Sequence, residues 1–134
     1  MTIGMERIAL DDGAKLAVAE RYAAATRGND TAAFLALCTS DAVTWHNTDD
    51  RAEPIENTAK GMAWLHRKVL DLAWTDVALL PTSTGFVSQT VMTGTAGGGP
   101  LRIHSCLIVT LNDDGLVTRI DEFLDPTQTA PLRS

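Results

Sequence analysis

A chain of 134 residues has the size of one domain, and its net charge of −6 argues against nucleic acid, whose phosphates are bound by clustered lysines and arginines. Charged residues make up 21% and apolar residues 45%, which is typical of a folded protein and not of a disordered one. The longest apolar runs are far shorter than the roughly twenty residues of a membrane-spanning helix, and no signal peptide is visible, so we expect a cytoplasmic protein without membrane contacts.

The first third of the chain is rich in alanine and predicts two helices. Asp11 and Asp12 offer a cap to the first helix, and Gly28 suits the position just past its end, where φ is often positive. Asp30 caps a short second helix. A short strand over residues 43–47 follows.

Residues 48–57 are polar and predict a surface loop. Asn57 or Thr58 would cap a third helix. The apolar face of this helix would comprise Met62, Leu65, Val69 and Leu72.

The second half of the chain predicts a β-meander. Turn signals separate four β-rich runs at about 74–81, 86–95, 101–111 and 116–125. Because short connections make consecutive strands antiparallel, helices followed by such a meander indicate an α+β fold. The helices must cover one face of the sheet, and a curled sheet would leave a pocket between the two layers.

Glu122 is the first candidate for chemistry. It shares a strand face with Ile120 and Leu124, and we expect this face to lie under the helices. Burial disfavours the charged form of a carboxylate, which would let Glu122 act as a general acid or base near neutral pH. The alternatives are a carboxylate neutralised by a structural partner, or one on the outer face at a strand end.

The triplet Trp45-His46-Asn47 is the second candidate. Alternation from Val43 puts Trp45 and Asn47 on the inner face and His46 on the outer face, unless a bulge at the strand end reverses this. In one interpretation His46 moves protons and the Asn47 amide holds a substrate oxygen. In the other, Trp45 belongs to the core while His46 and Asn47 form a turn.

Three further residues are candidates for binding substrate. Gln89 shares a face with Val87 and Val91, so it could be a buried hydrogen-bonding group in the cavity. Trp64 suits either the core or an aromatic pocket wall. His104 lies opposite the more apolar row of its strand, where a structural histidine is the competing interpretation.

The cysteines and histidines show no pattern of a cofactor site. Cys38 and Cys106 lie among apolar neighbours, which favours buried free thiols. His46, His66 and His104 lack the spacing of metal ligands. We therefore expect neither a metal nor another cofactor.

The strand over residues 101–111 also carries apolar groups on both faces, with Ile108 on the less apolar one. A monomer rarely leaves such a patch exposed, which favours a homodimer formed through the convex face of the sheet.

Three segments resemble a known family: the alanine-rich first helix, residues 40–47, and the ending 114–126. Over about residues 10–128 the chain is similar to the SnoaL-like branch of the nuclear-transport-factor-2-like superfamily. The resemblance implies a single domain over 1–134, a cone-shaped α+β roll with N-terminal helices packed on a curved antiparallel sheet that encloses a pocket. The superfamily includes ketosteroid isomerases, polyketide cyclases, scytalone dehydratase and limonene-epoxide hydrolase, and also members without catalysis.

The resemblance also suggests roles for single residues. Trp45 and Asn47 are similar to a tyrosine and an asparagine of the epoxide hydrolases, where the asparagine helps to position the attacking water, and Glu122 resembles the second aspartate of their Asp-Arg-Asp arrangement. The Arg-x-Asp pair that those enzymes also need is absent from residues 86–91. The isomerases have a catalytic aspartate near His46 or Asn47, and His46 could replace it if it turned inward. The cyclases use an acidic group in the cavity, for which Glu122 is available.

We therefore expect a cofactor-independent isomerase, cyclase or hydrolase acting on a small apolar oxygenated molecule. Glu122 or His46 would transfer the proton, while Asn47 and Gln89 would bind substrate oxygens. The competing hypothesis is a non-catalytic ligand-binding or protein-interaction domain of the same fold. The two hypotheses differ in whether two polar groups, one of them titratable, converge in an enclosed cavity.

Overall fold

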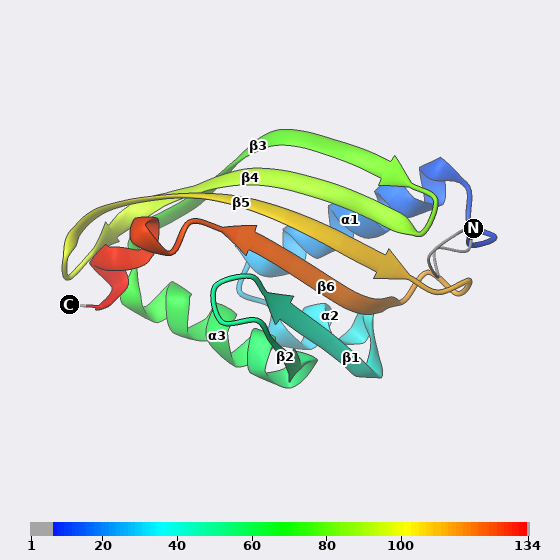
Figure 1. Cartoon of the computed structure of the whole chain (residues 1–134), viewed down its shortest axis with the longest axis horizontal. Helices are drawn as coiled ribbons and strands as arrows, with labels where there is room; N and C mark the ends of the chain where they lie inside the picture. The colour runs from blue at the N-terminus through cyan, green and yellow to red at the C-terminus, as the bar shows by residue number, and fades with distance from the viewer. Residues whose placement is uncertain (1–6, 134) are drawn as a thin grey trace.

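A computed structural model describes residues 7–133, in which helices lie against one face of a curved sheet (Figure 1). The helices are α1 (Asp12–Arg27), α2 (Thr31–Ala36) and α3 (Ile55–Lys68), and a 3₁₀ segment, η1 (Pro126–Arg133), follows the last strand. The strands are β1 (Cys38–His46), β2 (Arg51–Pro54), β3 (Leu70–Thr82), β4 (Gly85–Ala96), β5 (Gly99–Leu111) and β6 (Val117–Leu124). No helix in this part of the chain is long and apolar enough to cross a membrane.

The sheet is mixed, with the strand order β2-β1-β6-β5-β4-β3. The four strands from β3 to β6 form the predicted antiparallel meander. The predicted curved antiparallel sheet has one exception, because β1 lies parallel to β6. No short turn joins these two strands, so a tight connection does not dictate their relative direction. The chain therefore has the α+β fold expected, with one parallel pair inside it.

Two clusters of buried side chains form the core. The larger cluster joins α1, α2 and the start of α3 to the sheet, and includes Val18, Phe34, Phe86, Val109 and Ile120. The smaller cluster comprises Val69, Met92, Ala96, Leu101 and Ile103, and Leu132 of η1 packs against it. Residues of both clusters, among them Phe34 and Ile103, line a cavity between the helices and the sheet.

The predicted caps of the first two helices are confirmed. The Asp11 carboxylate accepts a hydrogen bond from the Ala14 amide at 2.7 Å, and the Asp30 carboxylate accepts one from the Ala33 amide at 3.0 Å. Gly28 does end α1, but its φ is −86°, and the left-handed residue is Asn29 with a φ of 53°. Asparagine tolerates this conformation, so the turn is made one residue later than predicted.

The third helix differs from its prediction at both ends. It begins at Ile55, directly after Pro54, and not at Asn57 or Thr58, so the polar loop contains the short strand β2. It ends at Lys68, and the following residues belong to β3. Leu72 has both helical spacing to the preceding apolar residues and strand spacing to Trp74, and pairing with β4 selects the strand.

A bulge at the start of β6 changes which residues face the core. Thr110 pairs with Arg119 whereas Leu111 pairs with Val117, so β6 carries one extra residue at Thr118. Val117, which simple alternation predicts on the outer face, is therefore fully buried at 0% exposure. Ile120 also faces the core. From Ile120 to the end of the strand, the side chains alternate between the two faces as predicted.

Both cysteines are free, and both are half-buried instead of fully buried. Burial raises the pKa of the Cys38 thiol to about 11, with a smaller contribution from the Glu56 carboxylate. The thiol is therefore protonated at neutral pH, and Cys38 is a packing residue in this structure.

Candidate active site

A cavity of about 420 Å³ lies between the helices and the inner face of the sheet, lined by residues from α1, α2, α3, η1 and the sheet strands. This volume is in the range of small-molecule sites. One end is walled by apolar residues of the smaller core cluster and its neighbours: Leu65, Trp74, Met92, Ile103, Leu124 and Leu132. Polar side chains lie further along the same sheet face.

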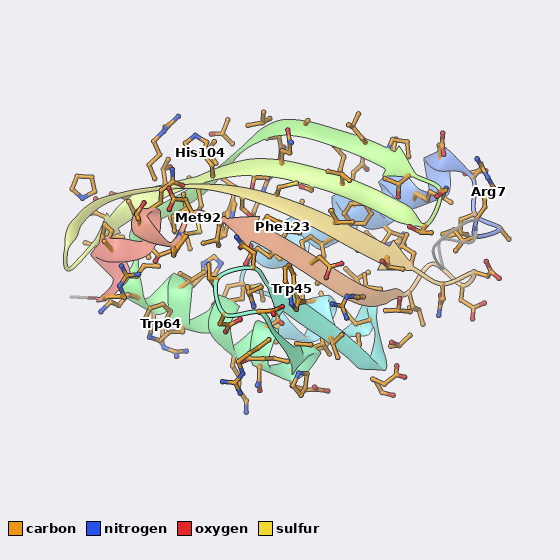
Figure 2. All side chains as sticks on the ribbon, in the orientation of Figure 1. Arg7, Trp45, Trp64, Met92, His104 and Phe123 are labelled. Carbon is orange, nitrogen blue, oxygen red and sulfur yellow. The ribbon has the colours of Figure 1, made fainter. Side chains whose placement is uncertain are left out.

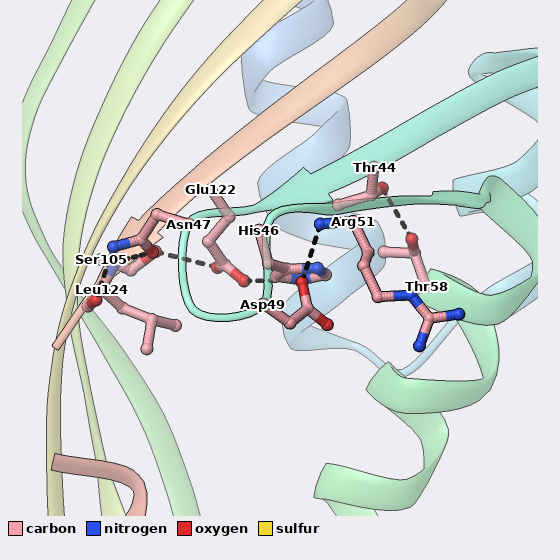
Figure 3. Close-up of polar contacts among 9 residues, drawn as sticks. All are labelled: Thr44, His46, Asn47, Asp49, Arg51, Thr58, Ser105, Glu122 and Leu124. Atoms are coloured by element: carbon pink, nitrogen blue, oxygen red, sulfur yellow. Dashed lines mark hydrogen bonds and ion pairs between the residues drawn. The ribbon is translucent and has the colours of Figure 1, made fainter. Parts of the chain in front are cut away.

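The central polar group is a hydrogen-bonded trio from three adjacent strands (Figure 3). His46 on β1 places Nε2 at 3.2 Å from Oε1 of Glu122 on β6, and Ser105 Oγ on β5 donates to Glu122 Oε2 at 3.0 Å. The two charged side chains are 30% and 26% exposed, and all three residues line the cavity. Two titratable groups thus converge in one cavity.

The Glu122 carboxylate sets the ionisation of its histidine partner. Its hydrogen bond is the largest cause that raises the pKa of His46 above 6.5, burial opposes the rise, and the charges of Glu122, Asp49 and Glu53 add to it. The protonated imidazole is thereby favoured at the pocket wall. Among residues 7–133, no three His, Cys, Asp or Glu side chains are arranged to hold a metal ion.

The inward position of His46 corrects the prediction that it lies on the outer face. Along β1 the buried inner residues are Ala42 and Thr44, and His46 continues this row. Helix α3 packs closely here, since Thr58 Oγ1 donates to Thr44 Oγ1 at 2.6 Å. The inner positions therefore carry small side chains, and alternation counted from the larger Val43 gives the wrong face.

Trp45 consequently lies on the outer face of the sheet, and the predicted inner position of Trp45 is wrong. Its ring packs edge-on against Phe123 of β6 with centroids 5.3 Å apart; both residues are labelled in Figure 2. The Trp45 Nε1 donates to the Asp50 carboxylate at 2.9 Å. Trp45 does not line the cavity.

Asn47 is exposed and its side-chain amide is bonded to the backbone of β6. The Leu124 amide donates to Asn47 Oδ1 at 3.0 Å, and Asn47 Nδ2 donates to the Leu124 carbonyl at 3.2 Å (Figure 3). These bonds hold the end of β1 against β6. Asn47 is thus placed outside the cavity, and the structure does not bring it to a substrate oxygen.

The remaining predicted residues divide between the two faces. Trp64 on α3 lies at the edge of the cavity and is 41% exposed. Gln89 and His104 lie instead on the outer face, together with Phe123 in a shallow hollow. The His104 amide donates to Gln128 Oε1 at 2.8 Å, which ties η1 to β5. The predicted inward position of Gln89 is wrong, because on β4 the residues in the cavity are the even-numbered ones from 88 to 92.

The polar residues of the pocket that the sequence analysis does not identify include Ser105 and Tyr22. Ser105 alternates with Ile103 and Leu107 on the inner row of β5, and this alternation was the available signal. Tyr22 on α1 packs edge-on against Phe34 and Phe86, with centroids 5.6 Å and 6.3 Å away.

The Tyr22 hydroxyl has no hydrogen-bond partner within residues 7–133, and its side chain lines the cavity. Burial, with the nearby Glu122 charge as a smaller cause, raises the pKa of Tyr22 far above its ordinary value of 10.0. The phenol therefore stays protonated and can donate a hydrogen bond into the pocket.

Comparison with known proteins identifies the family. Residues 19–120 match the SnoaL-like domain, so the chain belongs to the SnoaL-like family, within the nuclear-transport-factor-2-like superfamily. A search of curated proteins gives no match.

Solved structures of low sequence identity share the fold. PrhC from Penicillium brasilianum NBRC 6234 superposes with a TM-score of 0.78 at 19% identity, covering 90% of this chain and 85% of PrhC. BvnE pinacolase from Penicillium brevicompactum has a TM-score of 0.79 at 12% identity, with 99% and 93% covered. An M. tuberculosis LEH-like epoxide hydrolase has a TM-score of 0.70 at 15% identity, with 90% and 91% covered.

Proposed function

We propose that the protein is a cofactor-independent enzyme that transfers a proton to and from a mostly apolar, oxygenated small molecule, in the manner of an isomerase or cyclase. The observation that carries this proposal is the His46–Glu122 pair, which faces an otherwise largely apolar cavity. A pair of this kind can hold one proton between its members and exchange it with a bound substrate.

Each member of the polar group has a chemical task in this proposal. Glu122 orients the imidazole and stabilises its charged form, while Ser105 fixes the carboxylate from the other side. His46 exchanges the proton with the substrate carbon or oxygen. The neutral phenol of Tyr22 can donate to a substrate oxygen on which negative charge develops.

The relatives with named activities support this substrate class, since they include an epoxide hydrolase, a pinacolase and a putative polyketide cyclase. Between the possible reactions, residues 86–91 favour proton transfer over water activation. This stretch of β4 contains neither arginine nor aspartate, so it lacks the Arg-x-Asp pair of the limonene-epoxide hydrolases.

The proposal can be tested with a generic substrate. 2-Tetralone, a bicyclic ketone, exchanges the hydrogens beside its carbonyl with D₂O when a base removes them. We expect the protein to accelerate this exchange above the buffer rate, measured by proton NMR. Exchange at the buffer rate, with binding of the ketone still detected by titration, would favour the non-catalytic ligand-binding function.

A second prediction concerns the ionisation of His46 itself. Because Glu122 raises the pKa of His46, we expect its imidazole NMR signals to titrate above pH 6.5, and at lower pH in Glu122→Gln, which lacks the largest cause of the rise. Signals of His46 that titrate identically in both proteins would show that the pair does not form.

The raised pKa of His46 also has a consequence for the stability of the protein. A folded-state pKa above the unfolded value means that the pair's contribution to the free energy of unfolding is complete below about pH 6.5 and is lost as pH rises through the raised pKa. The stability difference between wild type and Glu122→Gln should therefore shrink over this interval, which denaturant titrations at several pH values would measure.

We also propose that the protein forms a homodimer through the outer sheet face. Exposed apolar side chains on this sheet support it, notably Val77, Ile108 and Phe123, of which Val77 is 63% exposed. Light scattering coupled to size exclusion should give the dimer mass at micromolar concentration, and Phe123→Glu should give the monomer. A monomeric mass for the wild type contradicts the proposal.

A further inference from the structure

Two hydroxyl groups of β4 line the cavity and are not used by the proton-transfer group. Ser88 and Thr90 lie on the inner row of β4, between the buried residues Phe86 and Met92, and both line the cavity. Neither side-chain hydroxyl makes a hydrogen bond within residues 7–133. A polar group in a ligand pocket without a protein partner is available to a ligand.

Strand register places these hydroxyls at a defined separation from the His46–Glu122 pair. Thr90 is opposite Ser105 on the neighbouring strand β5, about 5 Å away, and Ser105 is bonded in turn to Glu122 on β6. Ser88 is opposite Leu107, which is in turn opposite Glu122, so Ser88 and Glu122 are two strands or roughly 10 Å apart. The polar side chains therefore form a band across the inner face of the sheet, with the proton-transfer pair at one end and the two hydroxyls at the other.

The chemistry of this second end is neutral. Serine and threonine hydroxyls donate and accept hydrogen bonds without charge, which suits a hydroxyl or carbonyl oxygen better than a carboxylate or phosphate. The Arg27 guanidinium also lies in the cavity wall, but it is engaged in a two-bond contact with Asp76 of β3. Arg27 therefore adds no uncompensated positive charge to this end of the cavity.

We propose that Ser88 and Thr90 form a second hydrogen-bonding subsite, which holds a neutral oxygen of the substrate away from the reacting centre. The substrate is then an apolar skeleton of bicyclic dimensions with oxygen functions at both ends, spaced to reach protein groups about 10 Å apart. This inference rests on the proposed function in one respect: the first oxygen is the one held at His46 and Glu122.

Three probes that differ only in their hydroxyl groups test the subsite by calorimetry: naphthalene, 2-naphthol and 2,6-dihydroxynaphthalene. We expect the diol to bind roughly three- to tenfold more tightly than 2-naphthol, the gain of one additional hydrogen bond. Thr90→Val combined with Ser88→Ala should remove this preference, and Thr90→Ser should retain it. Thr93→Val, which removes a β4 hydroxyl outside the cavity, is the matched control.

The outcomes separate this inference from the proposed function. Equal affinities of the wild type for diol and mono-ol, or no binding of any probe, would overturn the subsite. A diol preference that survives the double substitution, with melting temperatures showing a folded protein, would overturn it as well. A preference lost in the double variant supports the subsite even if 2-tetralone exchange is absent, in which case only the proton-transfer proposal fails.

Discussion

Replacing Glu122 with glutamine is expected to lower the protein-dependent exchange of 2-tetralone by roughly two to four orders of magnitude, the usual contribution of general acid–base catalysis. Glutamine preserves the size of the side chain and can still accept hydrogen bonds from His46 and Ser105. It cannot carry the charge that favours protonated His46. The loss should therefore appear in turnover, while affinity for the ketone changes little.

The matched control for Glu122→Gln is Asp121→Asn on the same strand. Asp121 is paired with Arg119, whose Nε lies at 2.9 Å from the aspartate Oδ1, and it does not line the cavity. We expect near wild-type exchange in this variant. If Glu122→Gln lowers the melting temperature strongly while exchange per folded molecule is unchanged, the Glu122 carboxylate is a structural ion-pair partner and the catalytic proposal is wrong.

Phe86→Ala is expected to destabilise the protein by about 3–5 kcal/mol, the range for deleting a buried aromatic ring. Phe86 is 0% exposed in the larger core cluster, and its ring contacts Tyr22 of α1 edge-on. Removing it leaves a void between helix and sheet and frees Tyr22 to move. The free energy of unfolding from urea titrations measures the loss, and weaker ligand binding should accompany it.

Phe123→Ala tests whether the loss of unfolding free energy is large only when the deleted ring lies on the inner face. Phe123 is 40% exposed on the outer face and packs on Trp45. We expect a loss of about 1 kcal/mol, the size of one aromatic contact, measured at a protein concentration low enough that wild type and variant are both monomeric. Similar losses for the two substitutions would show that the outer face is as strongly packed as the core.

The sequence by itself determined the first two helices, the β-meander and the inner row at the end of β6. Aspartates at positions 11 and 30 mark helix starts because their carboxylates satisfy free amides, a local effect that needs no tertiary context. Short polar turns force the meander to be antiparallel for an equally local reason. On β6, Ile120 and Leu124 bracket Glu122 with a contrast strong enough to place the carboxylate on the inner face.

Only the tertiary structure decided which residues meet in the site. His46 comes next to Glu122 because β1 inserts beside β6 in parallel, a long-range pairing that no turn specifies. Which side chains of β1 face the helices could not be deduced from the sequence either. Its outer face is covered by an aromatic contact between Trp45 and Phe123, and its inner face carries small residues under α3. Alternation identifies the buried face only when one face is apolar and the other polar, and here both faces are packed.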